Sequence, residues 1–502
     1  MRLQAVFLMG TIGALLAGCS ATGDVGGASA QAGDVVRLQC RAGAGDACTA
    51  VPVASPRSWQ RLLTSDPGIP KTFEQLSDYQ RVLAERRELE PGDAGFEECG
   101  EASHQRLVLG LTNPELSGPQ RDIVAAAANA ELPSFEHRHE TEHFVLWWTN
   151  QSTHEKDNIP DSSIVEETAL YMEAAWDTYV RTFGRQPYLP EGADKMEVIF
   201  YDISGFGRAS PPQGPIQLDA YHFVDKPGIR QPTSAHELFH KLQYAYGYRT
   251  KHKPISPYKW FSEGTATWAE VYIWQRVSRG AKVTRIFDEP DRPLYDASYY
   301  AVPFWLYYHH ELDVDQKDPM VAYFESYDEI GYEEDVLASR IGADWTSSEA
   351  EPSVDNFFST FSMARVHGDW RSPALQPILG RDDIDVSDPH VFMNEVELTR
   401  DAAFSQTDSV SQLGSDYYRF GFDPEDDGNM IHLAIEGAPD GDFAYYLAWE
   451  WDGHIIAKSF PFWLDNQLTW STPFRPGYVD AMVVIVSGRD IGGDYTIRAS
   501  MD

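Results

Sequence analysis

Two histidines and two glutamates have the types and spacing of a metal site that activates water. His236 and His240 lie four residues apart, so on a helix their imidazoles share one face and can reach one ion. Glu237, between them, is placed to take a proton from a water held at that ion. Glu263, in Trp260-Phe-Ser-Glu-Gly, can supply a third ligand and leave the open fourth position of a catalytic zinc.

The same His-Glu-x-x-His pattern occurs a second time, as His139-Glu-Thr-Glu-His143. Its two middle residues are polar, and it runs directly into Phe144–Trp148, a short aromatic and β-branched segment typical of a strand. A metal-binding helix needs an apolar back that can be buried. We therefore predict that the metal site lies at residues 236–240 and that the copy at 139–143 is a chance match.

The later copy has the apolar pattern that the earlier one lacks. Residues at helical spacing supply a buried back: Ala235, Leu238, Phe239, Leu242 and Ala245. Thr233 or Ser234 is expected to cap the start of this helix, and Gly247 to end it.

These segments carry a family resemblance. His236-Glu-Leu-Phe-His240 followed by Glu263 in Trp-Phe-Ser-Glu-Gly resembles the gluzincin zinc metallopeptidases, most closely bacterial secreted members of the collagenase type and their relatives. The resemblance spans roughly residues 140–365. The spacing between His240 and Glu263 lies between those of the gluzincin aminopeptidases and the collagenases, so no subfamily is assigned. The resemblance implies that His236, His240 and Glu263 bind Zn²⁺, that Glu237 is the general base, and that the substrate is a peptide or protein. No Gly-Ala-Met-Glu-Asn-like segment precedes the helix, so an aminopeptidase specificity is not implied.

Two further residues are candidates for the site. By resemblance to aminopeptidase-like gluzincins, Tyr300 would stabilise the tetrahedral intermediate, although Tyr299 and Tyr300 could equally serve packing alone. Glu270 lies seven residues after Glu263 and hence on the same helical face. It either orients a ligand histidine or is a solvated surface acid.

The elements around the site follow a recognisable order. We predict strands at Phe144–Trp148, Met196–Tyr201 and Ile216–Val224, with a helix between the first two that Ser163 opens in a capping box and Gly184 ends. Strand, helix, strand, strand and metal helix is the order expected of the upper half of a zincin. The last strand would then form the sheet edge beside the cleft, where a peptide can add main-chain hydrogen bonds.

The hydrophobic pattern divides the rest of the chain into a helical part and a β-rich part. Helices at 302–312 and 354–365 are expected to close the lower half of the cleft. Alternating runs then predict a small antiparallel β-sandwich: Ile431–Ile435, Tyr445–Trp449, Met482–Val486 and Tyr495–Arg498. The expected fold class is α+β, with a zincin-like peptidase domain of mixed sheet and helices over 139–400 and the sandwich over 401–502.

Residues 56–138 are predicted to form a helical segment, either a pro-region or a packing domain.

The N-terminus predicts export. Residues 1–19 form a signal sequence whose end, Leu16-Ala-Gly-Cys19, resembles a bacterial lipobox with Cys19 as the lipidated residue; an ordinary cleaved signal is the alternative. Ser20 by the same resemblance favours an outer-membrane lipoprotein of the cell envelope. Gly/Ala/Ser/Asp-rich residues 20–35 predict a flexible tether, which we extend to residue 55.

The cysteine content and the net charge limit the redox compartment and the binding partners that can be expected. Of Cys40, Cys48 and Cys99, two are expected to pair in an oxidising compartment, and the third either occupies the open zinc position in a latent form or stays a plain thiol. The formal net charge of -37 excludes non-specific nucleic-acid binding and argues against adhesion to an anionic membrane surface.

We expect a lipid-anchored, zinc-dependent endopeptidase. Two other functions stay open: a degenerate peptidase whose sandwich binds surface polymer or protein, and a zinc hydrolase of non-peptide amides or esters. The complete set of four site residues argues against the first. The metal chemistry itself does not distinguish the second.

Overall fold

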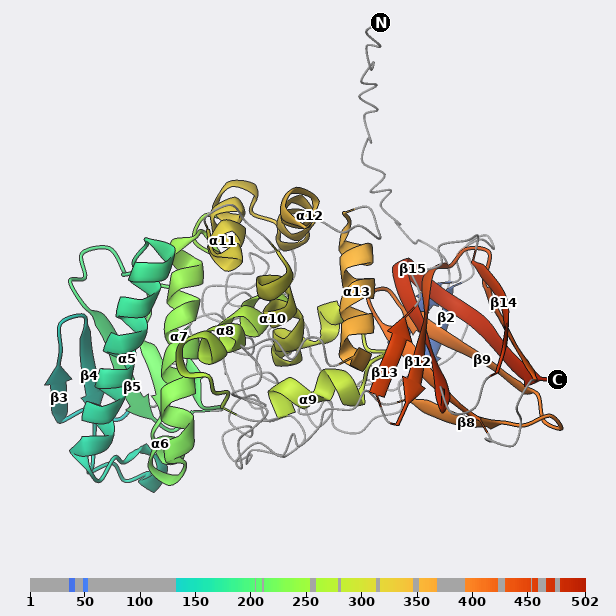
Figure 1. Ribbon diagram of the computed structural model, residues 1–502. Coiled ribbons are helices and arrows are strands. Elements are labelled where there is room, and N and C mark those ends of the chain that lie inside the picture. The colour runs from blue at the N-terminus through green and yellow to red at the C-terminus, as the bar shows by residue number, and fades with distance from the viewer. Residues whose placement is uncertain are drawn as a thin grey trace, which may run out of the picture. The chain divides into compact units, whose positions relative to one another are not determined.

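The computed structural model (Figure 1) describes two separate parts of the chain. They are the backbone of residues 36–40 and 48–52, and then residues 132–502 with gaps at 204, 210–211, 253–258, 279–280, 313–316, 346–351, 368–392, 423–428, 453, 459–465 and 475–478. Contacts divide the chain into one unit of Met1–Arg61 and another of Leu62–Asp502. The expected signal sequence, the helical segment up to residue 131 and Cys99 lie outside the described residues.

The first unit contains a hairpin. Strands β1 (Val36–Cys40) and β2 (Cys48–Pro52) pair antiparallel, with the Cα of Cys40 opposite that of Cys48. Both strands lie within the range 20–55 that was expected to be a tether.

The second unit begins with a five-stranded mixed sheet in the order β3-β4-β5-β7-β6. Its strands are β3 (His137–Glu140), β4 (Phe144–Trp148), β5 (Met196–Tyr201), β7 (Ile216–Asp219) and β6 (Gly207–Arg208). The central strands β4, β5 and β7 run parallel, and β3 and β6 pair antiparallel at the two ends of the order.

Two expectations for this sheet need correction. The predicted strand Ile216–Val224 ends at Asp219, because the Asp219 side chain accepts a hydrogen bond from the His222 backbone N–H and starts helix α6 (Ala220–Asp225). The edge strand is β6 and not this strand, because residues 207–208 fold back to pair with β7 on its outer side.

Helix α5 (Ser162–Phe183) packs against α7 (Arg230–Ala245), as Figure 1 shows. Its N-cap is Asp161, whose carboxylate accepts from the Ser163 N–H, so the predicted capping box opened by Ser163 is wrong by two residues. Gly184 ends the helix in the left-handed conformation (φ 64°), as predicted. The buried Tyr179 links the two helices, with its hydroxyl donating to the Ala235 carbonyl at 2.8 Å.

A second helical layer follows α7. It contains α8 (Lys259–Trp274), α9 (Ala281–Asp288), a 3-10 turn (Ser298–Ala301), α10 (Val302–Glu311), α11 (Pro319–Ile330), α12 (Glu333–Asp344) and α13 (Val354–His367). Aromatic side chains fill the space between them; Trp260 of α8 and Trp305 of α10 stack at 5.3 Å between ring centroids. The two predicted helices at 302–312 and 354–365 are thus confirmed as α10 and α13. Among the described residues, no helix is long and apolar enough to cross a membrane.

The C-terminal region is a largely antiparallel sheet of eight strands. The strands are β8 (Asn394–Leu398), β9 (Phe404–Ser411), β10 (Ser415–Phe422), β11 (Met430–Gly437), β12 (Asp442–Trp451), β13 (His454–Lys458), β14 (Gln467–Pro473) and β15 (Ala481–Met501). The pair β8–β10 is parallel, which departs from the antiparallel expectation.

Strand β15 joins the two halves of this sheet. Its first half pairs with β10 and β12, and its second half pairs with β9 and β11. The two runs predicted as separate strands, at 482–486 and 495–498, therefore belong to one strand that changes partners near Gly492.

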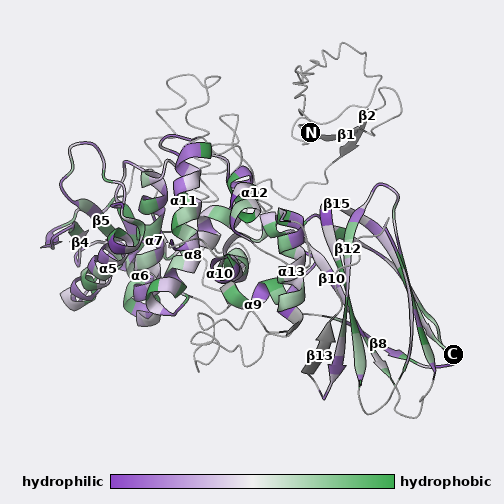
Figure 2. Cartoon of the chain, turned by 45° about the horizontal axis from the view of Figure 1, so that its top comes forward, coloured by the Kyte–Doolittle hydropathy of each residue, from purple (hydrophilic) through white to green (hydrophobic). Residues whose placement is uncertain are grey.

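Side chains of this sheet alternate between two cores. Val483 and Ile485 belong to the hydrophobic core shared with the helices. Met482, Val484 and Val486 belong to a second hydrophobic core, which the C-terminal strands form among themselves. Figure 2 shows hydrophobic residues along β10, β12 and β15, as this two-sided burial requires. A buried polar contact also joins the layers, since the Tyr417 hydroxyl donates to the Ser362 carbonyl of α13 at 2.9 Å.

Candidate metal centre

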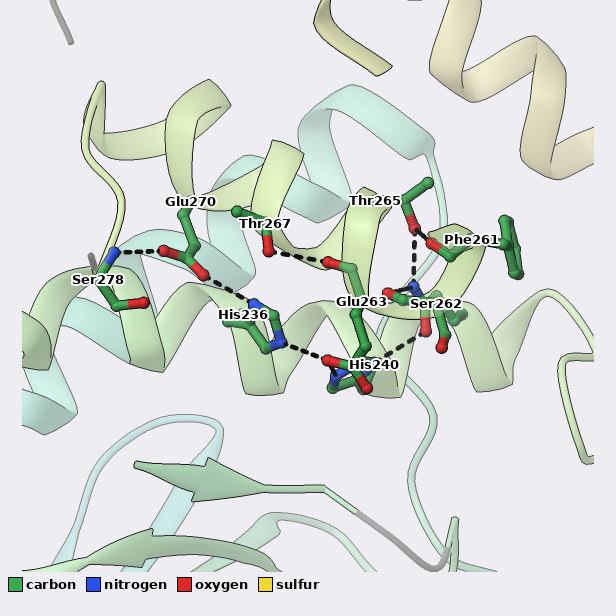
Figure 3. Close-up of polar contacts among 10 residues, drawn as sticks. His236, His240, Phe261, Ser262, Glu263, Thr265, Thr267, Glu270 and Ser278 are labelled. Atoms are coloured by element: carbon green, nitrogen blue, oxygen red, sulfur yellow. Dashed lines mark hydrogen bonds and ion pairs between the residues drawn. The ribbon is translucent and has the colours of Figure 1, made fainter. Parts of the chain in front are cut away.

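Helix α7 brings the two later histidines onto one buried face. The ligand atoms of His236, His240 and Glu263 all lie within 4.8 Å of one another, and these residues are the only such group among the residues that the structure describes. His236 Nε2 lies 3.1 Å from Glu263 Oε2, and His240 Nε2 lies 3.6 Å from the same oxygen. Figure 3 shows the three side chains converging from α7 and α8.

The start of α7 differs from the expected one. The helix begins at Arg230, directly after a 3-10 turn (Pro227–Ile229), and no side chain caps it. Arg230 itself is anchored: its guanidinium donates to the Phe223 carbonyl at 2.7 Å and to Glu167 at 2.6 Å. The predicted cap at Thr233 or Ser234 is therefore wrong, whereas Gly247 (φ 94°) follows the end of the helix closely, as expected.

Each histidine has an oxygen acceptor behind it. His236 Nδ1 lies 2.8 Å from Glu270 Oε1, and the other oxygen of Glu270 accepts from the Ser278 N–H at 2.7 Å. Glu270 is fully buried, so it is not a solvated surface acid. These contacts turn the Nε2 atom of His236 toward Glu263.

The acceptor behind His240 is Gln243, which sequence reasoning missed. Gln243 Oε1 lies 2.9 Å from His240 Nδ1. A spacing of three residues on a helix brings side chains together, so this glutamine was within reach of His240 from the sequence alone. Its connection to α8 depends on tertiary packing and could not be predicted.

The donor set suits zinc. Glu263 Oε1 is buried and has no hydrogen-bond partner among the described residues. Two imidazole nitrogens and a carboxylate oxygen, each turned inward, are a ligand set typical of catalytic zinc. The residues present therefore fit a zinc ion held by His236, His240 and Glu263.

The electrostatics of Glu263 and His240 agree with this assignment. Burial raises the pKa of Glu263, but the charge of His240 and hydrogen bonds from both histidines outweigh it and hold that pKa below its ordinary value. Burial likewise lowers the pKa of His240, and the neighbouring Glu263 carboxylate outweighs it and raises that pKa. The carboxylate thus stays ionised, at a place where a positive charge is stabilised.

Glu237 lies on the side of α7 that meets the sheet. It is buried, at 1% exposure, and a Cβ on Gly207 of β6 would come within 2.6 Å of its Oε1. One turn later, the buried Lys241 donates to the Pro212 and Gly214 carbonyls at 3.0 and 2.8 Å. Lys241 therefore holds the segment between β6 and β7 against α7, and β6 itself lies close to Glu237.

The two candidate tyrosines have different surroundings. The ring of Tyr299 lies 6.1 Å from that of His236, measured between centroids. Tyr300 instead accepts a hydrogen bond from Arg285 at 2.9 Å, and the Arg285 guanidinium lies 4.7 Å from its ring centroid. Tyr299 is thus the one of the pair found beside a predicted ligand.

The earlier His-Glu-x-x-His copy lies on strands and a turn. His139 belongs to β3 and pairs with Leu146, while His143 precedes β4. His143 Nδ1 lies 2.6 Å from Glu173 of α5, and its ring stacks on Trp176 at 4.6 Å. These contacts give His143 a packing role.

No protein-family model and no curated protein matches this chain. Among solved structures, the chain is similar to the pre-peptidase C-terminal domain of collagenase from Bacillus anthracis, at 17% identity and a TM-score of 0.17, over 22% of this chain and 95% of that one. It is also similar to the periplasmic lysozyme inhibitor PliG of Aeromonas hydrophila (13% identity, TM-score 0.16, 22% and 97% covered) and that of Salmonella Typhimurium (12%, 0.15, 22% and 99%). TM-scores this low support no function for the chain.

Proposed function

We propose that this protein is a zinc-dependent endopeptidase. The observation that carries the proposal is the convergence of His236, His240 and Glu263 in a buried site, with Glu237 on the same helix. This set can hold zinc and leave a position for water. A degenerate peptidase would be expected to lack one of these four residues.

Zinc, when bound, would supply a Lewis acid that polarises the scissile carbonyl. The protein's own residues would do the rest of the chemistry. Glu237 accepts a proton from the attacking water and passes it to the leaving amine. Glu270 holds the ring of His236 in place through Nδ1, which keeps Nε2 turned toward Glu263, where it would be available to bind zinc.

Two tyrosines are candidates for the donor that stabilises the oxyanion. The position of Tyr299 beside His236 favours it, whereas the resemblance to aminopeptidase-like enzymes favours Tyr300. Separate Phe substitutions would identify the donor. The variant that lacks the hydroxyl of the true donor is expected to have a kcat roughly 100-fold below that of the wild type, with KM little changed.

A peptide substrate is favoured by the position of β6. This strand ends the sheet order, and Gly207 lies against Glu237. An extended peptide added along such an edge would bring its main chain beside the general base. Esters and small amides have no extended main chain to pair there, which is why we rank a non-peptide hydrolase second.

Digestion of an unfolded protein tests the proposal. Internal fragments, identified by mass spectrometry, are expected to appear with the purified protein, to stop with a chelator and to return with added zinc. Turnover of small esters or amides alone would establish the second function. Binding of unfolded protein without cleavage, by a protein that retains zinc, would indicate a binding protein.

We also propose that Cys19 carries lipid and anchors the protein at the cell envelope. The support is the Leu16-Ala-Gly-Cys19 sequence. A fully acylated cysteine carries more than the single chain that gives marginal membrane binding. Wild-type protein should fractionate with membranes and Cys19→Ser should not; wild type found wholly soluble, without N-terminal lipid, would contradict the anchor.

A further inference from the structure

We infer that Gln243 is a positioning residue for the metal centre: its amide fixes the tautomer and orientation of His240 and ties that ligand to the helix that bears Glu263. The inference rests on the proposed zinc site. It concerns a residue that has no contact with the proposed ion and acts only through His240.

The orientation of the Gln243 amide follows from its partners. Gln243 Nε2 lies 2.8 Å from the Ser262 carbonyl, which can only accept a hydrogen bond. It also lies 2.9 Å from Thr265 Oγ1, whose own proton goes to the Phe261 carbonyl at 2.8 Å. Both contacts require the NH₂ group of Gln243 to face α8. The amide is therefore not free to flip.

A fixed amide determines the state of His240. Gln243 Oε1 must face His240 Nδ1, at 2.9 Å, and an amide oxygen can only accept. Nδ1 must then carry the proton, which leaves the lone pair on Nε2. This is the atom that lies 3.6 Å from Glu263 Oε2, on the side of the site where the ligand atoms converge.

The direction of each hydrogen bond is thus set by a backbone carbonyl of α8. Figure 3 labels the four partner residues of this network, Phe261, Ser262, Thr265 and His240. Because Ser262 directly precedes Glu263, the turn of α8 that presents the carboxylate ligand also orients the imidazole ligand. Gln243 is fully buried, so water cannot replace it as the acceptor without a rearrangement.

A neutral acceptor also suits the charge of the site. Behind His236 the acceptor is the carboxylate of Glu270, and Glu237 and Glu263 add two further buried acids. A fourth carboxylate behind His240 would increase the negative charge of a site that is already desolvated. An amide gives the same directional hydrogen bond without that charge.

The test compares two variants of the full-length protein that remove different ends of this network. Gln243→Met keeps the approximate length and volume of the side chain but offers His240 no oxygen acceptor. Thr265→Val removes one α8 partner of Gln243 and leaves Oε1 and the Ser262 contact in place. Zinc affinity is measured by chelator competition, the visible spectrum after cobalt substitution reports ligand geometry, and thermal unfolding of the metal-free proteins reports packing.

Gln243→Met is expected to lose about 10- to 100-fold in zinc affinity and to change the cobalt spectrum. Thr265→Val should lose comparable apo stability, yet stay within about threefold of wild type in zinc affinity and keep the wild-type spectrum. Wild-type affinity and spectrum in Gln243→Met would overturn the inference, as would equal losses of affinity in both variants, because these indicate a role in packing alone.

A third variant separates this inference from the proposed function. His240→Ala should abolish tight zinc binding. If it does so while Gln243→Met binds as wild type, only the positioning role is wrong. If His240→Ala itself retains zinc, the assigned site and the proposed function are wrong.

Discussion

The segments 139–143 and 236–240 carry the same His-Glu-x-x-His pattern, one across a turn between strands and the other along a buried helix. In the first, His139 and His143 have separate surroundings, and His143 is engaged by Glu173 and Trp176. In the second, the two histidines converge with Glu263 from another helix in a group that could hold a metal ion. The pattern alone therefore does not make a metal site.

The difference comes from the residues around the pattern. The later copy is followed by apolar residues that bury the back of α7 against α5 and α8. The earlier copy runs into β4, a central strand that pairs with β5 on one side and β3 on the other. Burial of Phe144 and Leu146 on that strand decides the local conformation, and the histidines follow it.

The largest expected effect is the difference in activity between variants of the two central glutamates, Glu237 and Glu140. Glu237→Gln keeps the size of the side chain but cannot accept a proton, so protein hydrolysis should fall by several orders of magnitude while zinc stays bound. Glu140→Gln, the same change in the earlier copy, should leave activity near wild type, since the Glu140 carboxylate forms ion pairs with Arg138 and Lys195 and does not belong to the candidate metal centre. Equal activities of the two variants in a fluorescent casein assay would contradict this account of the chemistry.

Zinc content is expected to differ between variants of the two copies of the pattern. His240→Ala or Glu263→Ala removes one of the three proposed zinc ligands, and zinc measured by mass spectrometry after dialysis should drop from about one per chain to near zero. His143→Ala should retain full zinc content. Zinc lost from the His143 variant and kept in the other two would place the metal at the earlier copy.

Gly207 of β6 offers a test of whether the sheet edge fixes the position of Glu237 in the later copy. A Cβ at this position would lie 2.6 Å from Glu237 Oε1, so Gly207→Ala should displace the proposed general base and lower kcat by about 10- to 100-fold with zinc retained. Gly228→Ala is the matched control, since nothing lies within 4 Å of a Cβ there. A Gly207→Ala enzyme with wild-type kcat would show that β6 does not constrain Glu237.

The smallest effect concerns the stability role of the earlier copy. His143→Ala loses the hydrogen bond to Glu173 and the stacking on Trp176, and should cost about 1–3 kcal/mol in the free energy of unfolding. Glu142→Ala, at an 84% exposed side chain, should change it by less than about 0.5 kcal/mol. Chemical denaturation measures both, and no loss in the His143 variant would remove its packing role.

Local patterns predicted the elements of this fold better than their ends and connections. The spacing of apolar residues located α7, α10 and α13, and Gly184 ended α5 as expected. The starts of α5 and α7 were wrong. Asp161 lies one residue before the first helical residue and caps it better, and α7 continues without a break from a 3-10 turn.

The parts of the site that were not predicted depend on contacts distant in sequence. The place of β6 at the sheet edge is set by its pairing with β7, and the link from Gln243 to α8 spans 19 residues to Ser262. A two-residue strand has no periodicity to recognise. The convergence of His236, His240 and Glu263, by contrast, could be predicted, because a metal site itself requires these residue types and, for the two histidines, this helical spacing.

X-ray absorption at the zinc edge of the purified wild-type protein tests the central claim most directly. We predict one zinc per chain with two imidazole nitrogens at about 2.0–2.1 Å and a carboxylate oxygen at about 2.0–2.2 Å, and loss of one imidazole contribution in His240→Ala. A protein that takes up no zinc, or a spectrum with two imidazoles that His240→Ala leaves unchanged, would contradict the assignment of His236, His240 and Glu263 as the metal centre.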